Sequence, residues 1–560
     1  MPQGTDKKSK LESIKEESNY LRGSISEELV NDLDYFGKDA IQLLKFHGTY
    51  QQDDRDLRQG RGKHYQVMIR TRIPGGGLSS DQYLALDQIA DKYADGTLRI
   101  TTRQTIQFHG VLKGDLRNTI RDINESLVTT LGACGDIVRN VMSNPAPDSD
   151  GRQEKVQEYT NHLSELLLPE TKAYHEIWLD GSKIYSSRQE ISNGEALYGD
   201  SYLPRKFKIA ISVPGDNSVD LYTQDIGLVA IFNEQEDITG FNVIVGGGMG
   251  MNHNKAETFP RLGDHFGYVP KDRLVPLVKS IIELQRDNGD RADRKHARMK
   301  YLIHDWGLDR FRAEVVKRTG FELEPFRPIP KFKLELYLGW HRQSGGKWYL
   351  GVNVENGRIK DEGKLRLRTG LREAIKKYNL NVRLTPTQNI LLTDIDEANK
   401  KPIEDELRGY GVPLTDELSN AIKYSMACPA LPTCGLAITE SERIMPEVIR
   451  DLEKEIRSLG LEEEQLTVRM TGCPNGCARP YVADIAFVGR SLNQYAVFIG
   501  GDPAGTRLNK KYRDHVPLEE LVSAVKPLLE IYRDGRKEGE SFGDYWNRMG
   551  IETLEETVAE

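Results

Sequence analysis

Four of the five cysteines in this 560-residue chain lie in two short segments near its C-terminus. The first segment is Cys428-Pro-Ala-Leu-Pro-Thr-Cys434 and the second is Cys473-Pro-Asn-Gly-Cys477. Four thiolates can hold an iron–sulfur cluster, and proline and glycine allow the backbone to turn tightly around it. A structural zinc site is the alternative, but the C-x5-C spacing of the first pair departs from the usual zinc pattern. We therefore expect all four cysteines to be cluster ligands.

The segments around these cysteines, 420–434 and 471–479, resemble the cluster signature of the siroheme-dependent sulfite and nitrite reductases. Other segments resemble the same family in the same order along the chain, namely 47–57, 72–76, 102–110, 203–208 and 245–248. Within the family the sequence is most similar to the hemoprotein (beta) subunits of assimilatory sulfite reductases. The resemblance implies two cofactors, a [4Fe–4S] cluster and a siroheme. It also implies that Cys477 is both a cluster ligand and the axial ligand of the siroheme iron.

The chain contains a weak internal repeat. Residues 75–107 and 357–392 each read as a turn, an amphipathic helix and a strand, and the strand ends in T-x-x-Q. Residues 204–212 and 468–477 form a second pair, and a short apolar strand follows each of them, at 226–231 and 485–489. Duplication predicts a large ligand between the repeats. The resemblance implies an α+β fold, internally duplicated with a pseudo-twofold axis, with three domains around a siroheme–[4Fe–4S] centre.

The expected domain boundaries follow turn-rich segments such as 143–151 and 326–330. We expect helices at 153–168, 274–289 and 443–459. The domains that we predict are an N-terminal extension (1–64), duplicated ferredoxin-like half-domains (65–131 with 331–413), a siroheme and substrate domain (132–330), and an iron–sulfur and siroheme domain (414–560).

Composition favours a protein of a reducing compartment. No apolar run approaches the ~18 residues that cross a bilayer, and the N-terminus lacks the apolar segment of a secretory signal. Five cysteines, four of them clustered, argue against a disulfide framework. A net charge of −8 argues against nucleic acid as the main partner. We expect a cytoplasmic protein without nucleic-acid or membrane partners.

Several basic residues are candidates for binding a small anion. Lys206 and Lys208 lie two apart in a predicted strand and share a face, as do Arg70 and Arg72. Alone, such pairs more often lie on solvated surfaces. The resemblance implies substrate contacts for four basic residues, which are Arg72, Arg139, Lys206 and Lys208. Lysines among other cations would donate protons, and arginines would clamp an oxyanion.

Siroheme carries eight carboxylates, so its pocket needs many hydrogen-bond donors. Arg99 and Arg103 are four apart in a predicted strand, with Gln107 on the same face and His109 beside it. An isolated histidine more often hydrogen-bonds its surroundings than ligates a metal. The predicted siroheme contacts are Arg99, Arg103, Gln107, His109, Gln388 and Asn475.

Two motifs are interpreted as non-functional. Cys134, in Gly132-Ala-Cys-Gly135, is expected to be a small buried residue. Some ferredoxin-linked relatives carry a cysteine just after the Arg-Asn pair that corresponds to Arg139-Asn140, crosslinked to a tyrosine. This chain has Val141 there, which favours the flavoprotein-linked branch. The glycine-rich segment 245–252 lacks the G-x-G-x-x-G spacing of a dinucleotide site, so electrons should come from another protein.

The resemblance predicts a six-electron reduction of sulfite to sulfide in sulfate assimilation and cysteine biosynthesis. The expected electron donor is an NADPH-dependent diflavin (FAD/FMN) flavoprotein alpha-subunit. One alternative is a ferredoxin-dependent sulfite or nitrite reductase on the same scaffold. An alternative of another class is a non-catalytic iron–sulfur electron-transfer subunit, which would leave the paired basic residues without a role.

Overall fold

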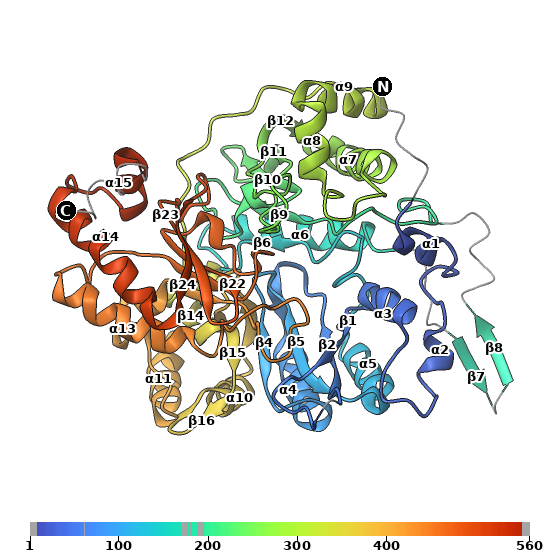
Figure 1. The fold of residues 1–560 in the computed structure, drawn as a ribbon, viewed down its shortest axis with the longest axis horizontal. Coiled ribbons are helices and arrows are strands. Elements are labelled where there is room, and N and C mark those ends of the chain that lie inside the picture. The colour runs from blue at the N-terminus through green and yellow to red at the C-terminus, as the bar shows by residue number, and fades with distance from the viewer. Residues whose placement is uncertain (1–7, 61, 170–175, 180–181, 187–194, 551–560) are drawn as a thin grey trace.

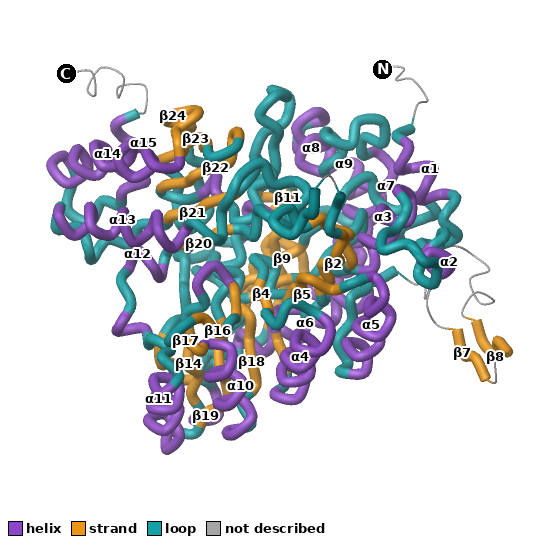
Figure 2. The backbone as a smooth tube through the Cα atoms, turned by 60° about the horizontal axis from the view of Figure 1, so that its bottom comes forward, coloured by secondary structure: helices purple, strands orange, loops and turns teal. Residues whose placement is uncertain are grey.

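Four five-stranded sheets make up the centre of the computed structural model, and most helices cover them from outside (Figure 1). The structure describes residues 8–60, 62–169, 176–179, 182–186 and 195–550. Loops gather between two of these sheets (Figure 2). One of the two sheets contains β9 (Ile209–Ser212) and β11 (Ile238–Val245), and the other contains β20 (Ser425–Ala427) and β22 (Ile485–Ser491). Within the described part of the chain, the helices are too short or too polar to cross a bilayer.

The first and third sheets have the same design. Their strand orders are β1-β2-β5-β4-β15 and β13-β14-β19-β18-β3. The first contains β1 (Thr49–Asp53), β2 (Tyr65–Arg70), β5 (Ile106–Val111), β4 (Leu98–Ile100) and β15 (Arg358–Ile359). The third contains β13 (Gly339–Arg342), β14 (Trp348–Val352), β19 (Ile390–Ile395), β18 (Asn381–Leu384) and β3 (Gly77–Leu78). The equivalent helices are α4 (Ser80–Tyr93) and α5 (Leu116–Glu125), and α10 (Leu367–Tyr378) and α11 (Lys400–Gly409).

The two half-domains exchange a short strand. β3 follows the first half-domain's β2 but pairs with β18, whereas β15 of the second pairs with β4. Gly76 and Gly357 permit the exchange, because a Cβ on either would lie 2.4 Å from a backbone oxygen of the other half, Leu384 O and Ile100 O. Both glycines also have a positive φ, which favours glycine. The exchange explains why the two halves share one core.

The second and fourth sheets repeat each other in the same way. Both have two parallel pairings followed by two antiparallel ones. The second contains β6 (Met142–Ser143), β9 (Ile209–Ser212), β10 (Ile226–Phe232), β11 (Ile238–Val245) and β12 (Asp264–Pro270). The fourth contains β20 (Ser425–Ala427), β21 (Val468–Thr471), β22 (Ile485–Ser491), β23 (Gln494–Ile499) and β24 (Lys510–Pro517). The predicted α+β fold and its duplication are confirmed, and the duplication covers both kinds of domain.

The predicted helices are confirmed as α6 (Arg152–Leu166), α7 (Leu274–Asn288) and α13 (Met445–Ser458), and α14 (Leu521–Gly535) is the counterpart of α7 in the fourth sheet's domain. The remaining helices are α1 (Lys10–Glu16), α2 (Ile25–Glu28), α3 (Lys38–Leu44), α8 (Met299–Trp306), α9 (Leu308–Thr319), α12 (Asn420–Lys423) and α15 (Phe542–Met549). Two small hairpins pair β7 (Glu176–Leu179) with β8 (Ser182–Ser186), and β16 (Asp361–Glu362) with β17 (Leu365–Arg366).

The N-terminal segment is fixed to the domain of the second sheet by a buried lysine. Lys15 Nζ of α1 donates to Leu203 O at 2.9 Å and pairs with Glu12 at 2.7 Å. Asp136, which receives two bonds from Arg294, lies 3.9 Å from the same ammonium. The contacted segments run directly into Arg139 and Lys206, so α1 supports the loops that carry these two predicted substrate residues.

Candidate active site

The structure brings the four predicted cluster cysteines together at one edge of the fourth sheet. β20 and β21 are parallel neighbours, so Cys428 and Cys473, which follow their carboxyl ends, lie close together. The Gly472 amide donates to Cys428 Sγ at 3.4 Å. Burial, and then the thiols of Cys477 and Cys473, raise the pKa of Cys428, and burial followed by Cys477 raises that of Cys473 to about 12. The Cys434 thiol also interacts electrostatically with the Cys477 thiol.

Four thiolates suit an iron–sulfur cluster, and the C-x5-C spacing of the first pair departs from the usual zinc pattern. The thiols lie in the turns that the sequence predicted, and one of these turns contains a cis Leu431–Pro432 bond.

Cys477 lies where three parts of the chain meet. Its carbonyl accepts a hydrogen bond from Thr102 Oγ1 of the first half-domain at 3.0 Å. Its thiol is exposed and interacts electrostatically with the Arg70 guanidinium. Asn475, two residues earlier, donates to Cys473 Sγ at 3.4 Å and contacts the glycine-rich segment, since a Cβ on Gly250 would lie 3.4 Å from Asn475 O.

Lys206 and Lys208 share a face, as predicted. Both precede β9, and between them Phe207 is buried and bridges Val138, so that the lysines lie on the opposite side of an extended segment. Burial, followed by Lys208 and Arg205, lowers the pKa of Lys206 far below its usual 10.5. Burial, followed by Arg103 and Arg298, does the same for Lys208. A lysine with a lowered pKa is a better proton donor near neutrality.

Arginines surround the two lysines. Arg139 donates through Nε and Nη2 to Gly135 O, at 3.2 and 3.1 Å, and interacts electrostatically with both ammonium groups. Arg298 pairs with Asp225 at 2.8 Å. The Asp225 carboxylate also accepts a hydrogen bond from the Lys208 amide, at 2.9 Å. Among the named groups the cations outnumber the single carboxylate, so this group of cations is suited to binding an anion.

Arg72 lies outside this group of cations, which corrects our expectation. Its guanidinium donates to Gly132 O and Val138 O at 3.0 and 2.9 Å, and to Ser164 Oγ and O at 3.1 and 2.9 Å. β2 ends at Arg70, so the alternation that would have put Arg70 and Arg72 on one face stops there. Arg70 is instead the arginine that interacts electrostatically with Cys477.

Cys134 is buried, as expected, but its thiol also contacts two polar side chains. Arg70 Nη1 donates to its Sγ at 3.0 Å, and the Tyr50 hydroxyl hydrogen-bonds the same thiol. Burial, and then Cys134, raise the pKa of Tyr50 to about 12. The cysteine lies five positions before Arg139 rather than after Asn140. A cysteine–tyrosine pair is therefore present, and its supposed absence no longer favours a flavoprotein donor.

The predicted single strand through Arg99, Arg103 and Gln107 is wrong. β4 ends at Ile100, the chain reverses, and β5 begins at Ile106. Arg99 and Gln107 are cross-strand partners, whereas Arg103 lies in the turn and donates to Gln224 Oε1 at 2.9 Å and to Asn140 O.

Arg99 is already engaged at the domain interface. It pairs with Glu442 at 2.8 Å and donates to Ala427 O at 2.9 Å. Ala427 directly precedes Cys428, so these bonds hold the first cysteine loop to the first half-domain. A contact between Arg99 and the siroheme stays a prediction.

Three predicted siroheme contacts carry buried polar atoms without a hydrogen-bond partner among the described residues. These atoms are Arg103 Nε, His109 Nε2 and Gln388 Oε1. Gln388 Nε2 donates to Ala427 O at 3.1 Å, and burial followed by Arg358 and Arg99 lowers the pKa of His109. Buried polar atoms normally have partners. The orphaned Arg103 Nε is a donor and His109 Nε2 can be one, and beside several cations such donors fit a large group with many carboxylates, so the residues present fit siroheme.

Two family descriptions match most of the chain. One is the nitrite and sulphite reductase 4Fe-4S domain, at residues 158–323 and 419–560, and the other is the nitrite/sulfite reductase ferredoxin-like half domain, at 58–126 and 341–410. The chain belongs to the nitrite and sulfite reductase family. This membership confirms that the protein is an oxidoreductase with siroheme and a [4Fe–4S] cluster, and it sets aside the zinc alternative.

Individual proteins are similar over nearly the full length. The chain is 48% identical to the sulfite reductase [ferredoxin] of Synechococcus elongatus, covering 98% of this chain and 90% of that protein. It is 45% identical to the sulfite reductase [NADPH] hemoprotein beta-component of Staphylococcus carnosus, covering 97% and 95%. The solved structure of Mycobacterium tuberculosis NirA has the same fold, with a TM-score of 0.79 and 24% identity over 97% and 96% of the chains.

The glycine-rich segment of this reductase is not arranged to bind a phosphate. The amides of Gly246, Gly247 and Gly248 donate to Asp225 O, Gln224 O and Arg261 O. Lys300 donates to the carbonyls of Gly248 and Gly250 at 3.1 and 2.8 Å. Phosphate binding needs free amides, so the structure agrees with the interpretation that this is no dinucleotide site.

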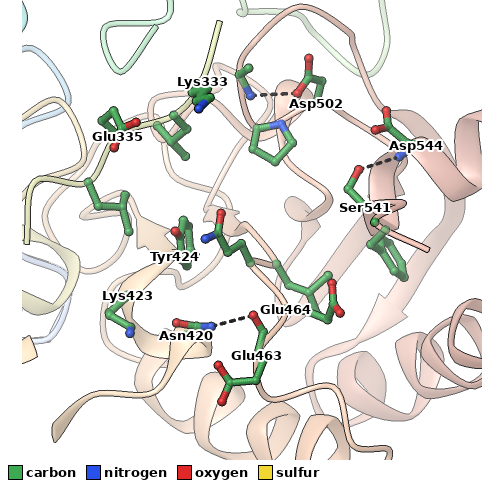
Figure 3. Close-up of a pocket in the computed structure, with 18 of the residues that line it drawn as sticks. Lys333, Glu335, Asn420, Lys423, Tyr424, Glu463, Glu464, Asp502, Ser541 and Asp544 are labelled. Carbon is green, nitrogen blue, oxygen red and sulfur yellow. Dashed lines mark hydrogen bonds between the residues drawn. The ribbon is translucent and has the colours of Figure 1, made fainter. Parts of the chain in front are cut away.

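A large groove lies elsewhere on the reductase. Its volume is about 1200 Å³, and it runs between the segment 331–338 and the domain of the fourth sheet. Lys333, Glu335, Glu463 and Asp502 are among its charged lining residues (Figure 3). None of the predicted site residues lines it among the residues that the structure describes, so we do not place the substrate there.

Sequence reasoning missed several residues of the site. Arg205 and Arg298 contribute charge around Lys206, Arg70 interacts electrostatically with Cys477, and Tyr50 contacts Cys134. Arg70 was visible as the partner of Arg72, and the end of the strand decides between them. Arg298 comes from the start of α8, far along the chain, and no local pattern marks it.

Proposed function

We propose that this protein is the hemoprotein component of an assimilatory sulfite reductase, which reduces sulfite to sulfide by six electrons. The observation that carries the proposal is the position of Lys206 and Lys208 among arginines. One of them, Arg103, also interacts electrostatically with Arg70, which in turn interacts with Cys477. Sulfite is a small dianion that must be held and repeatedly protonated. Two lysines of lowered pKa and several fixed guanidinium groups meet both needs.

The proposed substrate residues are Arg70, Arg139, Lys206 and Lys208. Arg70 replaces the predicted Arg72. The arginines would bind the sulfite oxygens, since a guanidinium keeps its proton and presents paired donors. The lysines would donate protons to oxygens that leave as water. When bound, the siroheme and the cluster supply the electrons for this reduction at the haem iron.

The four cysteines would hold the cluster, with Cys477 also ligating the siroheme. Six residues remain proposed siroheme contacts, and they are Arg99, Arg103, Gln107, His109, Gln388 and Asn475. Support comes from the orphaned atoms of Arg103, His109 and Gln388. A non-catalytic electron carrier would need neither these atoms nor the lysine pair, and family membership also argues against it.

The proposed electron donor is an NADPH-dependent diflavin flavoprotein alpha-subunit. Proteins named as NADPH-type hemoprotein beta-components support it, at 43–45% identity in several bacilli and staphylococci. A ferredoxin is the second candidate, because the Synechococcus relative is named for ferredoxin and because Tyr50 contacts Cys134. Both donors would deliver electrons to the cluster. A cytoplasmic location, in sulfate assimilation and cysteine biosynthesis, fits either donor.

The first experiment is an absorption spectrum followed by turnover assays. A split Soret region with a red band would establish siroheme, and the protein should then oxidise reduced methyl viologen when sulfite is added. Faster turnover of nitrite than of sulfite at equal concentrations would overturn the substrate assignment. Purified diflavin reductase with NADPH, compared with reduced ferredoxin, would decide the donor. A brown protein without haem bands after reconstitution with siroheme would favour the electron carrier.

A further inference from the structure

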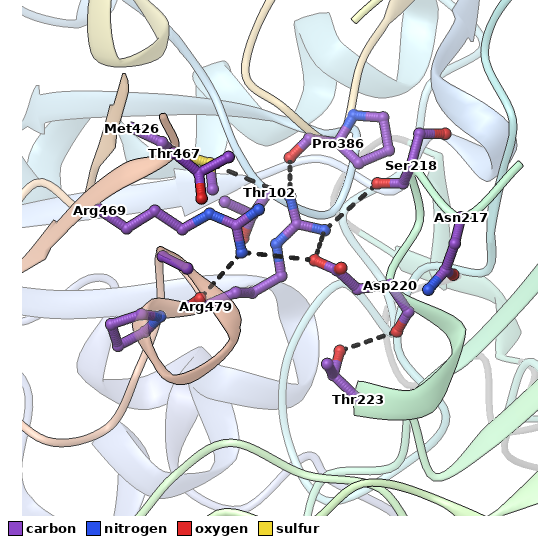
Figure 4. Close-up of polar contacts among 12 residues, drawn as sticks. Thr102, Asn217, Ser218, Asp220, Thr223, Pro386, Met426, Thr467, Arg469 and Arg479 are labelled. Atoms are coloured by element: carbon purple, nitrogen blue, oxygen red, sulfur yellow. Dashed lines mark hydrogen bonds and ion pairs between the residues drawn. The ribbon is translucent and has the colours of Figure 1, made fainter. Parts of the chain in front are cut away.

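A buried ion group lies behind the second cysteine loop. Asp220 Oδ2 lies 2.5 Å from Arg479 Nη1 and 3.8 Å from Arg469 Nη1 (Figure 4). The side chains of Asp220, Arg469 and Arg479 are 1%, 2% and 7% exposed. The group therefore contains two guanidinium groups and one carboxylate in a nearly dry environment.

The three residues come from different parts of the chain. Asp220 precedes η5 (Leu221–Thr223) in the domain of the second sheet, Arg469 lies on β21, and Arg479 precedes η11 (Pro480–Val482). Arg479 Nη2 also donates to Pro386 O at 2.7 Å, in the second half-domain. One guanidinium thus joins three domains directly behind the cysteines.

Arg479 also fixes the conformation of the loop. Its φ of 52° is unusual for a residue other than glycine. Its amide donates to Gly476 O at 3.0 Å, which closes the turn that contains Cys477. Its carbonyl accepts from Arg469 Nη1 at 2.9 Å. Because both backbone groups and the side chain are engaged, a change at Asp220 is transmitted to the cysteine loop.

Asp220 is also connected to Arg103, one of the predicted siroheme contacts. Its carbonyl accepts from Gln224 Nε2 at 3.2 Å, and Gln224 Oε1 accepts from Arg103 Nη1 at 2.9 Å. Asp220 Oδ1 has no hydrogen-bond partner within the described chain, so the carboxylate is stabilised mainly by the two arginines. If the charge of Asp220 or of one arginine is removed, the net charge of the group changes, and the group is too deeply buried for water to screen that change.

Buried charges near an iron–sulfur cluster change its reduction potential, because reduction adds a negative charge. We propose that Asp220 is a positioning residue that holds the Cys473–Cys477 loop through Arg479, and that its carboxylate keeps the cluster potential lower than the two arginines alone would set it. The inference goes beyond the proposed function, because it holds whether the substrate is sulfite or nitrite.

The test is a redox titration of the full-length holoenzyme, followed by electron paramagnetic resonance. In Asp220→Asn the midpoint potential of the cluster should shift to more positive values, since one buried negative charge is lost while both guanidinium groups and the Asp484 carboxyl that acts on Arg469 remain. In Arg469→Gln it should shift to more negative values. Opposite shifts are the expected signature, because a purely structural role would lower stability in both variants without that difference in sign.

Asp87→Asn is the matched control. Asp87 is also a buried carboxylate between two arginines, Arg368 and Arg372, but it joins the outer helices α4 and α10. The control should melt at a lower temperature and keep the wild-type potential. Unchanged potentials in both test variants at full iron content would overturn the proposal. If Asp220→Asn takes up no cluster, Arg469→Gln decides, and a shift to positive values or no shift would overturn it.

Discussion

The guanidinium of Arg70 lies 3.0 Å from the thiol of Cys134, measured from Nη1 to Sγ. The contact links two residues that the sequence had assigned to other roles. Arg70 had been set aside in favour of Arg72, and Cys134 had been read as an inert buried residue. In the structure Arg70 and the Tyr50 hydroxyl both contact the Cys134 thiol, and the charge of Arg70 reaches Cys477.

Arg70→Gln and Arg72→Gln should therefore fail in different ways. Loss of a charge-assisted contact to sulfite costs about 1.5–3 kcal/mol, so Arg70→Gln should raise the KM for sulfite roughly tenfold to a hundredfold and melt normally. Arg72→Gln should instead destabilise the fold by on the order of 3 kcal/mol, because four bonded protein oxygens lose their donor. Steady-state kinetics and thermal melts of both variants test this. The reverse pattern would restore Arg72 as the substrate residue.

Lys206→Arg should separate proton donation from charge. The variant keeps the positive charge but holds its proton too tightly to donate it, so kcat should fall by about 100-fold or more while the siroheme spectrum stays unchanged. In the wild type, burial and the cations Lys208 and Arg205 lower the Lys206 pKa. Its protonated fraction therefore falls at lower pH than for a free lysine, and kcat should decline on the alkaline side. A Lys206→Arg enzyme with the wild-type kcat and pH profile would remove Lys206 from this role.

Glu442 should stabilise the protein in a pH-dependent way. Burial alone would raise its pKa, but Arg358 and Arg99 lower it to about 2 from the usual 4.5. A carboxylate with a depressed folded-state pKa stabilises fully above the unfolded pKa and loses this contribution as the pH falls toward 2. Glu442→Gln should cost about 3–5 kcal/mol near pH 7, and the difference from wild type should shrink below pH 4.5.

Glu440→Gln is the control for Glu442→Gln, because Glu440 lies only two residues from Glu442 and pairs with the half-exposed Arg443. Surface pairs contribute less than about 1 kcal/mol, so this variant should melt close to the wild type at every pH. Equal losses of unfolding free energy in the two variants would mean that the buried pair is no stronger than the surface pair. Urea denaturation at pH 7 and pH 3.5 provides the measurement.

Sequence patterns predicted the elements that repeat, because the repeats are local. Gln104 and Gln388 end the two T-x-x-Q segments, and both have a positive φ, 55° and 69°. The backbone amides of the two glutamines make equivalent hydrogen bonds, which they donate to Thr101 O and Thr385 O. The four cysteines were equally predictable, since each pair is contiguous in the sequence.

Reversals of the chain and long-range pairs were not predictable from these patterns. The Arg99–Gln107 segment looks like one strand because its polar residues recur at even spacing, yet it turns at Thr101–Thr105, where two backbone bonds close the reversal. The Asp220–Arg479 pair joins residues far apart in sequence, and although Arg479 ends the second cysteine motif, Asp220 belongs to no local motif. Which of two basic residues enters a cavity depends on where a strand ends.

The surface around the first cysteine loop should be where the protein donor approaches the cluster. Leu436, between Cys434 and Thr439, is 70% exposed, and Arg55 fixes this loop by donating to Cys434 O and Ala437 O. An exposed leucine beside the cluster ligands is suited to a transient protein contact.

Leu436→Asp should slow turnover with the diflavin reductase or ferredoxin at least severalfold. Turnover with reduced methyl viologen, a small molecule that needs no protein interface, should stay unchanged. Leu127→Asp is the control, since Leu127 is 88% exposed at the end of α5. Equal rates for the wild type and Leu436→Asp with the protein donor would place its binding site elsewhere.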